Sequence, residues 1–377
     1  MSENSWHNKS YGGYFKSLEQ QLERRNDTGS TSTGRKKSKK PVQNQKFKGG
    51  VYRIRKSVVA LTAVIALVIA GVTVINALAK SQDDMGNIKK QENNVSAVKR
   101  AEEEQKTFLT SYTFSDNTQS IPDSNDAKAA IIIDKQNNTV VAERNSHEKM
   151  YPASTTKIMT LIVAAEHLKD LDDTFTMTYE ITDPLFVAEA SVAGFLNDEV
   201  ITVRDLFYGT VLPSGADAAM GLAIMTAGSE KAFVEMMNEK VAQLGLEGTH
   251  FTNVVGLHDV NNYSTAYDMA VILDTALQDD FCKKILSTYQ YTTSKTPQNP
   301  DGILLSNTLF EYMYGTEPET ATILGGKTGF VNESGYCIAS YGECNSNGNE
   351  YIIVTMGNSS KWPAFYGQID LYKEFAR

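Results

Sequence analysis

The chain has 377 residues, enough for one large domain or two smaller ones. Its formal net charge is −9, but residues 1–56 carry 14 Lys and Arg against 4 Asp and Glu, a balance of +10, whereas the remainder carries 22 against 41, a balance of −19. A body this acidic repels a phosphate backbone, which argues against a nucleic-acid-binding protein.

Cysteine and histidine usage argues against disulfide scaffolds and zinc enzymes. The three cysteines, Cys282, Cys337 and Cys344, are too few for a disulfide framework, and no Cys-x-x-Cys occurs. Pairing of Cys337 with Cys344 across a hairpin stays open, although low and odd usage favours free thiols. The five histidines lack the His-x-x-x-His spacing of zinc sites. The sequence predicts no metal and no cofactor.

The N-terminal region has the pattern of a membrane anchor. Residues 1–56 are polar and basic, a composition that cannot bury enough apolar surface to fold, and are interpreted as a disordered tail. Ser57 to Ala79 form an uncharged apolar stretch of 23 residues, long enough to cross a bilayer as a helix. Lys and Arg residues directly precede it, so its N-terminal side is predicted to be cytoplasmic and the body extracytoplasmic.

Cleavage of this helix is the alternative. Ala77-Leu78-Ala79 resembles a signal-peptidase site, which predicts secretion after cleavage near Ala79. The long apolar run and the long segment before it favour an uncleaved single-pass anchor in the cell membrane. Residues 80–126 are charged and polar, and they are interpreted as an extracytoplasmic stalk or linker.

Residues 127–377 are predicted to form the folded domain. Alternating and buried-strand patterns predict strands at 129–134, 139–143, 336–341 and 351–356. Helical periodicity predicts helices at 203–227, interrupted at 213–215, and at 230–246, 267–277 and 364–375. Residues 288–320 are polar and are expected to hold few strands. This order fits one antiparallel sheet shared by the N- and C-terminal strands, with a helical insertion between them.

Three Ser-x-x-Lys pairs are candidate nucleophile–base pairs, at Ser96/Lys99, Ser146/Lys149 and Ser154/Lys157. Positions i and i+3 share a helix face, so the lysine amine can lie beside the hydroxyl and take its proton. Only Ser154 precedes an apolar stretch of helical period, which places it at the N-terminus of a core helix, where backbone amides favour a developing oxyanion. Ser154 is therefore the predicted nucleophile and Lys157 its base.

Two further stretches suit a binding site. Pro213-Ser214-Gly215 breaks two apolar helical segments and presents a hydroxyl at the edge of the core, although a plain helix–helix turn fits equally well. Gly325-Gly326-Lys327-Thr328-Gly329 sets a lysine among glycines, which let a backbone approach a ligand, and an ammonium there suits a carboxylate. The phosphate-loop pattern is absent because position 321 is Ala.

The three motifs together resemble a known family. Ser154-Thr-Thr-Lys157, Ser214-Gly-Ala216 and Lys327-Thr-Gly329 resemble the Ser-x-x-Lys, Ser-x-Asn and Lys-Thr-Gly motifs of the penicillin-recognising serine enzymes. The stretches YPASTTKIMT, LFYGTVLPSGADAA and GGKTGFVNESGYC are similar to the D-alanyl-D-alanine carboxypeptidases of serine peptidase family S11. The resemblance covers roughly residues 127–377. It implies a β-lactamase/transpeptidase-like α/β fold of α+β type, with a five-stranded antiparallel sheet flanked by helices, here preceded by one transmembrane helix.

The resemblance also implies roles in catalysis. Ser154 would be acylated by a peptidoglycan stem peptide ending in D-Ala-D-Ala, Lys157 would take its proton, and Ser214 would relay a proton to the leaving D-alanine. Water would then release the shortened peptide, and β-lactam antibiotics such as penicillins would acylate Ser154 in the same way.

The remaining family positions would bind substrate. Lys327 and Thr328 would hold the terminal carboxylate, with Gly329 beside them, and the backbone amides of Ser154 and Phe330 would form the oxyanion hole. Ala216 stands where the family motif has Asn, and loss of that hydrogen-bonding side chain costs on the order of 1–3 kcal/mol when a partner is left unpaired.

Two alternatives stay open. A serine β-lactamase shares the motifs and fold, but the corresponding region, Glu189–Phe195, lacks the Glu-x-x-Leu-Asn pattern that holds a deacylating water. A protein that binds D-Ala-D-Ala without turnover is the other, with Ala216 as the mark of lost activity; the intact Ser154/Lys157 pair argues against it.

Overall fold

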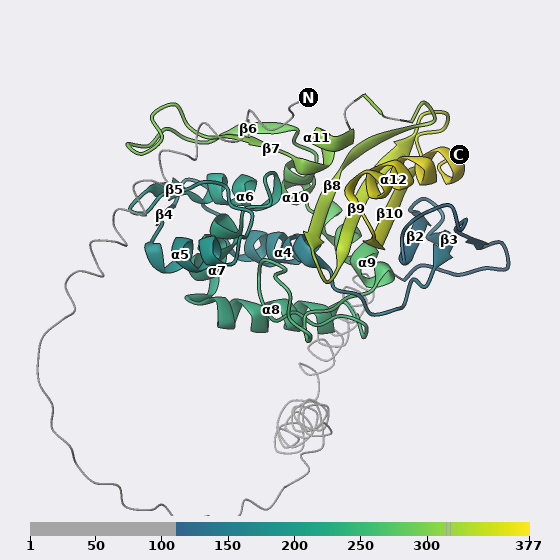
Figure 1. Cartoon of the computed structure of the whole chain (residues 1–377), viewed down its shortest axis with the longest axis horizontal. Helices are drawn as coiled ribbons and strands as arrows, with labels where there is room; N and C mark the ends of the chain where they lie inside the picture. Colours follow the sequence, from purple (N-terminus) through teal and green to yellow (C-terminus); the bar gives the residue numbers. More distant parts are fainter. Residues whose placement is uncertain (1–110, 314, 317) are drawn as a thin grey trace, which may run out of the picture. The chain divides into compact units, whose positions relative to one another are not determined.

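The computed structural model describes residues 111–377, apart from residues 314 and 317 (Figure 1). The predicted tail 1–56, the predicted membrane span 57–79 and most of the predicted stalk therefore lie outside the described residues. In the part that is described, no helix combines the length and the apolar character needed to cross a bilayer.

A six-stranded sheet with the strand order β1-β3-β2-β10-β9-β8 forms the centre of the fold. Its strands are β1 (Gln119–Ser120), β2 (Ala129–Asp134), β3 (Thr139–Arg144), β8 (Ala321–Val331), β9 (Gly335–Cys344) and β10 (Glu350–Asn358). Five of them are antiparallel neighbours, but β1 pairs with β3 in parallel. The prediction of a five-stranded, wholly antiparallel sheet is thus wrong by one short parallel edge strand.

The physical reason for this sixth strand lies in Arg144. Strand β1 has only two exposed polar residues, so no hydrophobic alternation marks it in the sequence. The guanidinium of Arg144 donates to the carbonyl oxygens of Ile121, Pro122, Asn125 and Ala127, at 2.6–2.9 Å. Its fixed fork of donors suits several acceptors at once and fastens the segment that follows β1 to the end of β3.

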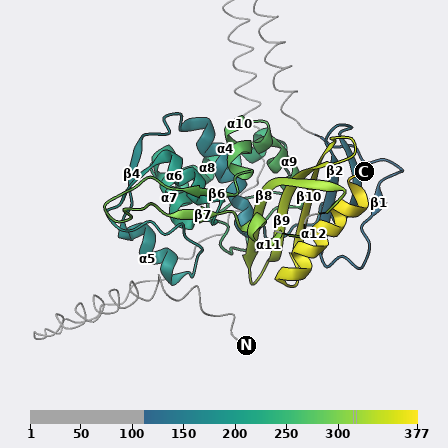
Figure 2. The same cartoon turned by 90° about the horizontal axis from the view of Figure 1, so that it is seen from above.

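The sheet separates two apolar cores, and strand β2 contributes to both. Ala129, Ile131 and Ile133 pack on the side of α4 (Lys157–His167) and α9 (Ala266–Leu277), whereas Ala130 and Ile132 pack on the side of α12 (Lys361–Phe375). Burial of both faces explains why β2 is a continuous apolar run, since successive residues of a strand point to opposite faces. Figure 2 shows α12 covering one face of the sheet and the helical insertion extending from the other side.

The insertion between β3 and β8 is helical, as predicted, and also holds two small two-stranded sheets. Its remaining helices are α5 (Tyr179–Val187), α6 (Val203–Val211), α7 (Ala216–Ala227), α8 (Glu230–Gln243), α10 (Asp280–Leu286) and α11 (Thr308–Met313). One of these sheets pairs β4 (Thr174–Thr176) with β5 (Val200–Thr202), which lie on either side of α5 in the chain, and the other is the hairpin of β6 (Gln290–Thr292) with β7 (Leu304–Ser306). The predicted break of the helix at 213–215 is confirmed, because α6 ends and α7 begins on either side of it.

The β6–β7 hairpin falls in the stretch where few strands were expected. Its short strands depend on buried carboxylates of the insertion: Tyr291 Oη donates to Asp205 at 2.7 Å, and Asn299 Nδ2 donates to Glu199 at 2.8 Å. Asp205 and Glu199 are each 1% exposed. Because carboxylates far away in the sequence hold the hairpin, its own residues show no hydrophobic periodicity from which it could be predicted.

Candidate active site

Ser154 lies where the chain passes from the sheet into the core helix α4. It belongs to a single 3-10 turn, η1 (Ala153–Thr156), and Lys157 is the first residue of α4. Ser154 thus stands at a helix N-terminus, as the periodicity predicted. The preceding Ala153 has φ +48°, a left-handed conformation that costs energy for a residue with a Cβ and is typical of functional sites.

The amine of Lys157 contacts the hydroxyl of Ser154. Its Nζ lies 3.1 Å from Ser154 Oγ and donates to the carbonyl oxygen of Val255 at 2.7 Å. The side chain is buried, and this burial lowers the pKa of Lys157 to about 7, although the charge of Asp217 acts in the opposite direction. A large fraction of the amine is therefore neutral at pH 7, which is the state that a general base needs.

Strand β8 brings the Lys-Thr-Gly motif against Ser154. A Cβ on Gly329 would lie 2.8 Å from the amide nitrogen of Ser154, so glycine is what allows this approach. Lys327 is 1% exposed, and its Nζ donates to the carbonyl of Thr328 at 2.9 Å. Burial and the charge of Lys157 hold the pKa of Lys327 well below its usual value.

The hydroxyl of Thr328 has a partner that the motif does not predict. Thr308, the first residue of α11, places its Oγ1 2.7 Å from the Oγ1 of Thr328. The backbone amide of Thr308 donates to the carbonyl of Leu212 at 3.1 Å, at the end of α6. Thr308 therefore connects the Lys-Thr-Gly strand with the turn that carries Ser214.

Ser214 and Ala216 lie at the turn from α6 into α7, and α7 packs against α4. Ser214 has φ +65°, and its buried Oγ has no hydrogen-bond partner among the described residues. Ala216 is 1% exposed, and its backbone amide donates to the carbonyl of Ser191 at 2.7 Å. Ser214 is thus a buried hydroxyl available to a substrate or a water molecule, whereas Ala216 offers no polar side chain.

Phe330, the last predicted site residue, follows the motif on the same strand. Its side chain is 46% exposed and stacks on Tyr336, with 4.3 Å between the ring centroids. The predicted role of Phe330 rests on its backbone amide, so the exposed ring is free to form part of the site's rim.

Residues 253–257 support the site although the motifs do not mark them. Gly256 has φ +81°, and a Cβ there would lie 1.8 Å from the carbonyl oxygen of Ala153. Asn253 Oδ1 accepts from the amides of Gly256 and Leu257, at 2.7 and 3.1 Å, and so shapes the loop that presents the Val255 carbonyl to Lys157. The signal in the sequence is an asparagine followed three residues later by a glycine, a pattern too common to identify a site by itself.

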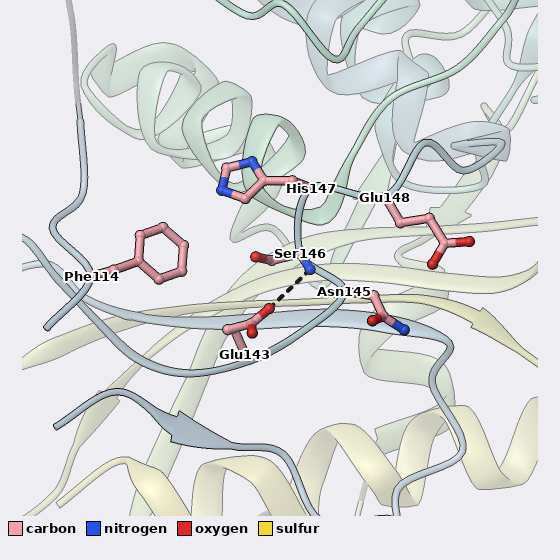
Figure 3. A pocket seen from close by; sticks show the side chains of 6 residues that line it. All are labelled: Phe114, Glu143, Asn145, Ser146, His147 and Glu148. Atoms are coloured by element: carbon pink, nitrogen blue, oxygen red, sulfur yellow. Dashed lines mark hydrogen bonds between the residues drawn. The ribbon is translucent and has the colours of Figure 1, made fainter. Parts of the chain in front are cut away.

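The other Ser-x-x-Lys pair in the described part is not a nucleophile–base pair. Ser146 lines a separate pocket with Phe114, Glu143, Asn145, His147 and Glu148 (Figure 3). Its backbone amide donates to Glu143 at 3.0 Å, the dashed line in Figure 3. The Nζ of Lys149 lies instead 4.0 Å from the centre of the Tyr263 ring. The pair Ser96/Lys99 lies outside the described residues.

Cysteines and possible metal ligands do not join the site. Cys282, Cys337 and Cys344 are buried free thiols, so Cys337 and Cys344 do not pair. Across residues 111–377, without 314 and 317, no group of three His, Cys, Asp or Glu side chains is arranged to hold a metal ion.

Comparison with known proteins agrees with this geometry. The model of the D-alanyl-D-alanine carboxypeptidase family matches residues 115–360. The chain is 30% identical to DacF of Bacillus subtilis over 257 residues, which are 67% of this chain and 62% of that protein. It is 32% identical to DacA of Haemophilus influenzae over 239 residues, 61% and 57% of the two chains. The chain thus spans only about 60% of the length of these curated relatives.

Solved structures extend the likeness to the fold. A variant of the DD-transpeptidase of Streptomyces K15 superposes with a TM-score of 0.59 at 27% identity, covering 66% of this chain and 97% of that one. Penicillin-binding protein 5 from Haemophilus influenzae gives a TM-score of 0.59 at 29% identity, covering 68% and 71%. Because the family model spans the sheet, the helical insertion and all three motifs, the chain belongs to the D-alanyl-D-alanine carboxypeptidase family.

Proposed function

We propose that the chain is a serine-type D-Ala-D-Ala carboxypeptidase, which removes the terminal D-alanine from peptidoglycan stem pentapeptides through an acyl-enzyme on Ser154. The observation that carries the proposal is the buried amine of Lys157, 3.1 Å from Ser154 Oγ and with its pKa lowered to about 7. Membership of the carboxypeptidase family supports the same substrate class.

In the acylation step, neutral Lys157 accepts the Oγ proton as Ser154 attacks the carbonyl carbon of the penultimate D-alanine. The amides of Ser154 and Phe330 stabilise the oxyanion, an arrangement supported by the close approach of Gly329 to the Ser154 amide. When the C–N bond breaks, the proton reaches the departing amine through Ser214 Oγ, which is buried and unpartnered among the described residues. Water then attacks the ester and releases the shortened peptide.

Lys327 suits the substrate's terminal carboxylate for an electrostatic reason. Its pKa is held low by burial and by the neighbouring charge of Lys157. A bound carboxylate supplies the opposite charge, which favours the ammonium form of Lys327. Binding of substrate therefore favours protonation of Lys327. Thr328 Oγ1, which is held by Thr308, adds a hydrogen bond to the same carboxylate. Gly329 and Ala216 line the substrate with their backbones.

The proposal includes the placement of the enzyme at the membrane. Residues 57–79 would anchor the chain, residues 1–56 would stay in the cytoplasm, and residues 80–126 would hold the catalytic domain, 127–377, on the outer side. The uncharged length of 57–79 and the basic residues before it support this topology. Peptidoglycan lies on that side of the membrane.

Labelling of the full chain with a fluorescent penicillin tests the acyl-enzyme. Wild type should be labelled and Ser154→Ala should not. Ser146→Ala is the matched control, because Ser146 has the same Ser-x-x-Lys spacing but no lysine beside it, and it should keep the label. If both variants keep the label, or if both lose it, the assignment of Ser154 is refuted. Release of free D-alanine from a D-Ala-D-Ala peptide then measures turnover.

The same assays separate the alternatives. A serine β-lactamase would hydrolyse the penicillin and lose its label quickly; Glu189, the first residue of the segment that would need a water-holding glutamate, is exposed. A protein that binds without turnover would release no D-alanine. A DD-transpeptidase, the activity named for the Streptomyces K15 structures, differs in the acceptor and would transfer the acyl group to an added amine rather than to water.

A further inference from the structure

A carboxylate next to the catalytic groups is buried without a role in the three motifs. Asp217, in the first turn of α7, is 1% exposed. Its Oδ1 accepts from the amides of Ala193 and Ala218 at 2.7 and 2.9 Å, and its Oδ2 accepts from Gly194 and Phe195 at 3.0 and 3.2 Å. Burial raises the pKa of Asp217 above its ordinary value, and the four amide donors oppose this rise because they favour the ionised carboxylate.

These hydrogen bonds hold residues 193–195 across the start of α7. The approach is close enough that a Cβ on Gly215 would lie 2.7 Å from the amide nitrogen of Ala193 and 2.8 Å from Asp217 Oδ1. The amide of Ala216 adds a bond to the carbonyl of Ser191. The whole carboxylate is occupied by backbone amides, so Asp217 cannot replace the asparagine side chain that is missing at position 216.

The charged groups around Lys157 come from three neighbouring elements. Asp217 on α7 raises the pKa of Lys157 against burial, and Lys327 on β8 is a second buried amine, whose pKa is held well below its usual value by burial and by the charge of Lys157. Glu230, the first residue of α8, accepts from the amide of Val254 at 3.2 Å, one residue before the carbonyl that Lys157 contacts. Asp217 is therefore the carboxylate whose charge acts on the buried amine of Lys157.

We propose that Asp217 is a positioning residue for acylation: it fastens residues 193–195 to the turn that carries Ser214, and it stands in the first turn of α7, which packs against the helix that begins at Lys157. Because Ala216 offers no polar side chain, Asp217 is the polar side chain through which the first turn of α7 acts on the base. This inference rests on the proposed function, because it assigns to Asp217 an effect on Lys157, the proposed base for Ser154.

The rate of Ser154 labelling by a fluorescent penicillin as a function of pH tests it on the full chain. Neutral Lys157 is the reactive form, so the wild-type rate should increase with pH around the pKa of Lys157 and then reach a plateau. The rising part of this pH profile is its acid limb. Asp217→Asn removes the negative charge and should move this limb to lower pH by about one unit. It should also lower the plateau rate, because the NH₂ group of Asn cannot accept from the two backbone amides that bond to one carboxylate oxygen of Asp217.

Asp205→Asn is the matched control. Asp205 is also 1% exposed and accepts from Tyr291 and from the amide of Ser294, but it does not act on the pKa of Lys157. This variant should lose thermal stability and keep the acid limb of wild type. Equal shifts in the two variants would show that loss of a buried carboxylate perturbs the site only structurally.

Asp217→Glu keeps the inference testable if Asp217→Asn does not fold. The longer carboxylate retains the charge but displaces residues 193–195, so the acid limb should stay in place and the plateau should fall. An unmoved limb in a folded Asp217→Asn variant, or an unchanged plateau in Asp217→Glu, overturns the inference. Absence of Ser154-dependent labelling in wild type would instead overturn the proposed function.

Discussion

The Nζ of Lys157 lies 3.1 Å from the Oγ of Ser154. The same nitrogen donates to the carbonyl of Val255 at 2.7 Å, a bond that a neutral amine retains while its lone pair accepts the hydroxyl proton. Burial makes this neutral state accessible near pH 7, because it removes the solvation that stabilises an ammonium ion. The site therefore holds a fixed amine with a pKa close to neutrality, as the proposed role of Lys157 as a base requires.

Lys157→Arg should nearly abolish acylation. A guanidinium stays protonated at any pH that the protein tolerates, so it supplies the positive charge without the base. Loss of a general base typically costs a factor of about 10²–10⁴ in rate. The second-order rate of penicillin labelling measures the change, with Lys149→Arg as the control at the lysine that stacks on Tyr263. Labelling of Lys157→Arg at the wild-type rate would show that another group takes the proton.

The acylation rate should increase with pH and level off above neutrality. The pKa of Lys157 is lowered to about 7, so the fraction of neutral amine grows through this value and is nearly complete two units above it. Labelling rates from pH 5.5 to 9 should therefore fit one ionisation with a midpoint near 7. A rate that falls across this range would contradict Lys157 as the base and would point to a group that acts in its protonated form.

Folding stability should also increase with pH between about 7 and 9. The folded-state pKa of Lys157 lies below the value of 10.5 for a free lysine, so the unfolded chain binds more protons in this window and stability grows as pH rises. The gain from this residue is about 2 kcal/mol across the two units. Urea unfolding at pH 7 and pH 9 should show the gain in wild type and a smaller gain in Lys157→Met. Above pH 9 the trend is opposed by buried Cys282 and Cys337, since burial raises the pKa of each thiol.

The order of apolar and turn-forming residues predicted those elements that interactions between sequence neighbours determine. Strand β2 follows from an uninterrupted apolar run, and the α6–α7 break follows from Pro213-Ser214-Gly215. Strand β1 and the β6–β7 hairpin were not predicted, because Arg144, Asp205 and Glu199 hold them through hydrogen bonds from distant parts of the chain. A polar strand held by a remote buried charge carries no periodic signal of its own.

The same distinction applies to the site. The Ser154/Lys157 contact is local, three residues apart on one helix, and its geometry could be predicted. The carbonyl of Val255 lies 98 residues from Lys157 in sequence, and Thr308 lies 20 residues from Thr328. Neither partner could be predicted, because only the tertiary fold brings these loops to the motifs.

Ala216→Asn should raise the rate of D-alanine release. An amide side chain at the start of α7 restores a donor for the substrate and an acceptor for Lys157, and one hydrogen bond of about 1–3 kcal/mol corresponds to roughly a 5- to 150-fold change in rate. Release of D-alanine from a D-Ala-D-Ala peptide measures the effect, with thermal unfolding as the check on folding. A folded variant with an unchanged or lower rate would show that the site, in which Ala216 is fully packed, has adapted to the small side chain.

Gly256→Ala should abolish penicillin labelling, because residue 256 lies in the loop that packs against Ala153, next to Ser154. A Cβ at this position would lie 1.8 Å from the carbonyl oxygen of Ala153, so the turn that carries Ser154 or the loop that presents the Val255 carbonyl to Lys157 must shift. Gly228→Ala is the matched control: its φ of +76° imposes a similar backbone strain of about 1–3 kcal/mol, but nothing lies within 4 Å of the added carbon. Both variants should therefore lose thermal stability, while only Gly256→Ala should lose penicillin labelling. Equal labelling of the two would show that η1 tolerates the displacement, and that the tight contact between Gly256 and Ala153 does not control the position of Ser154.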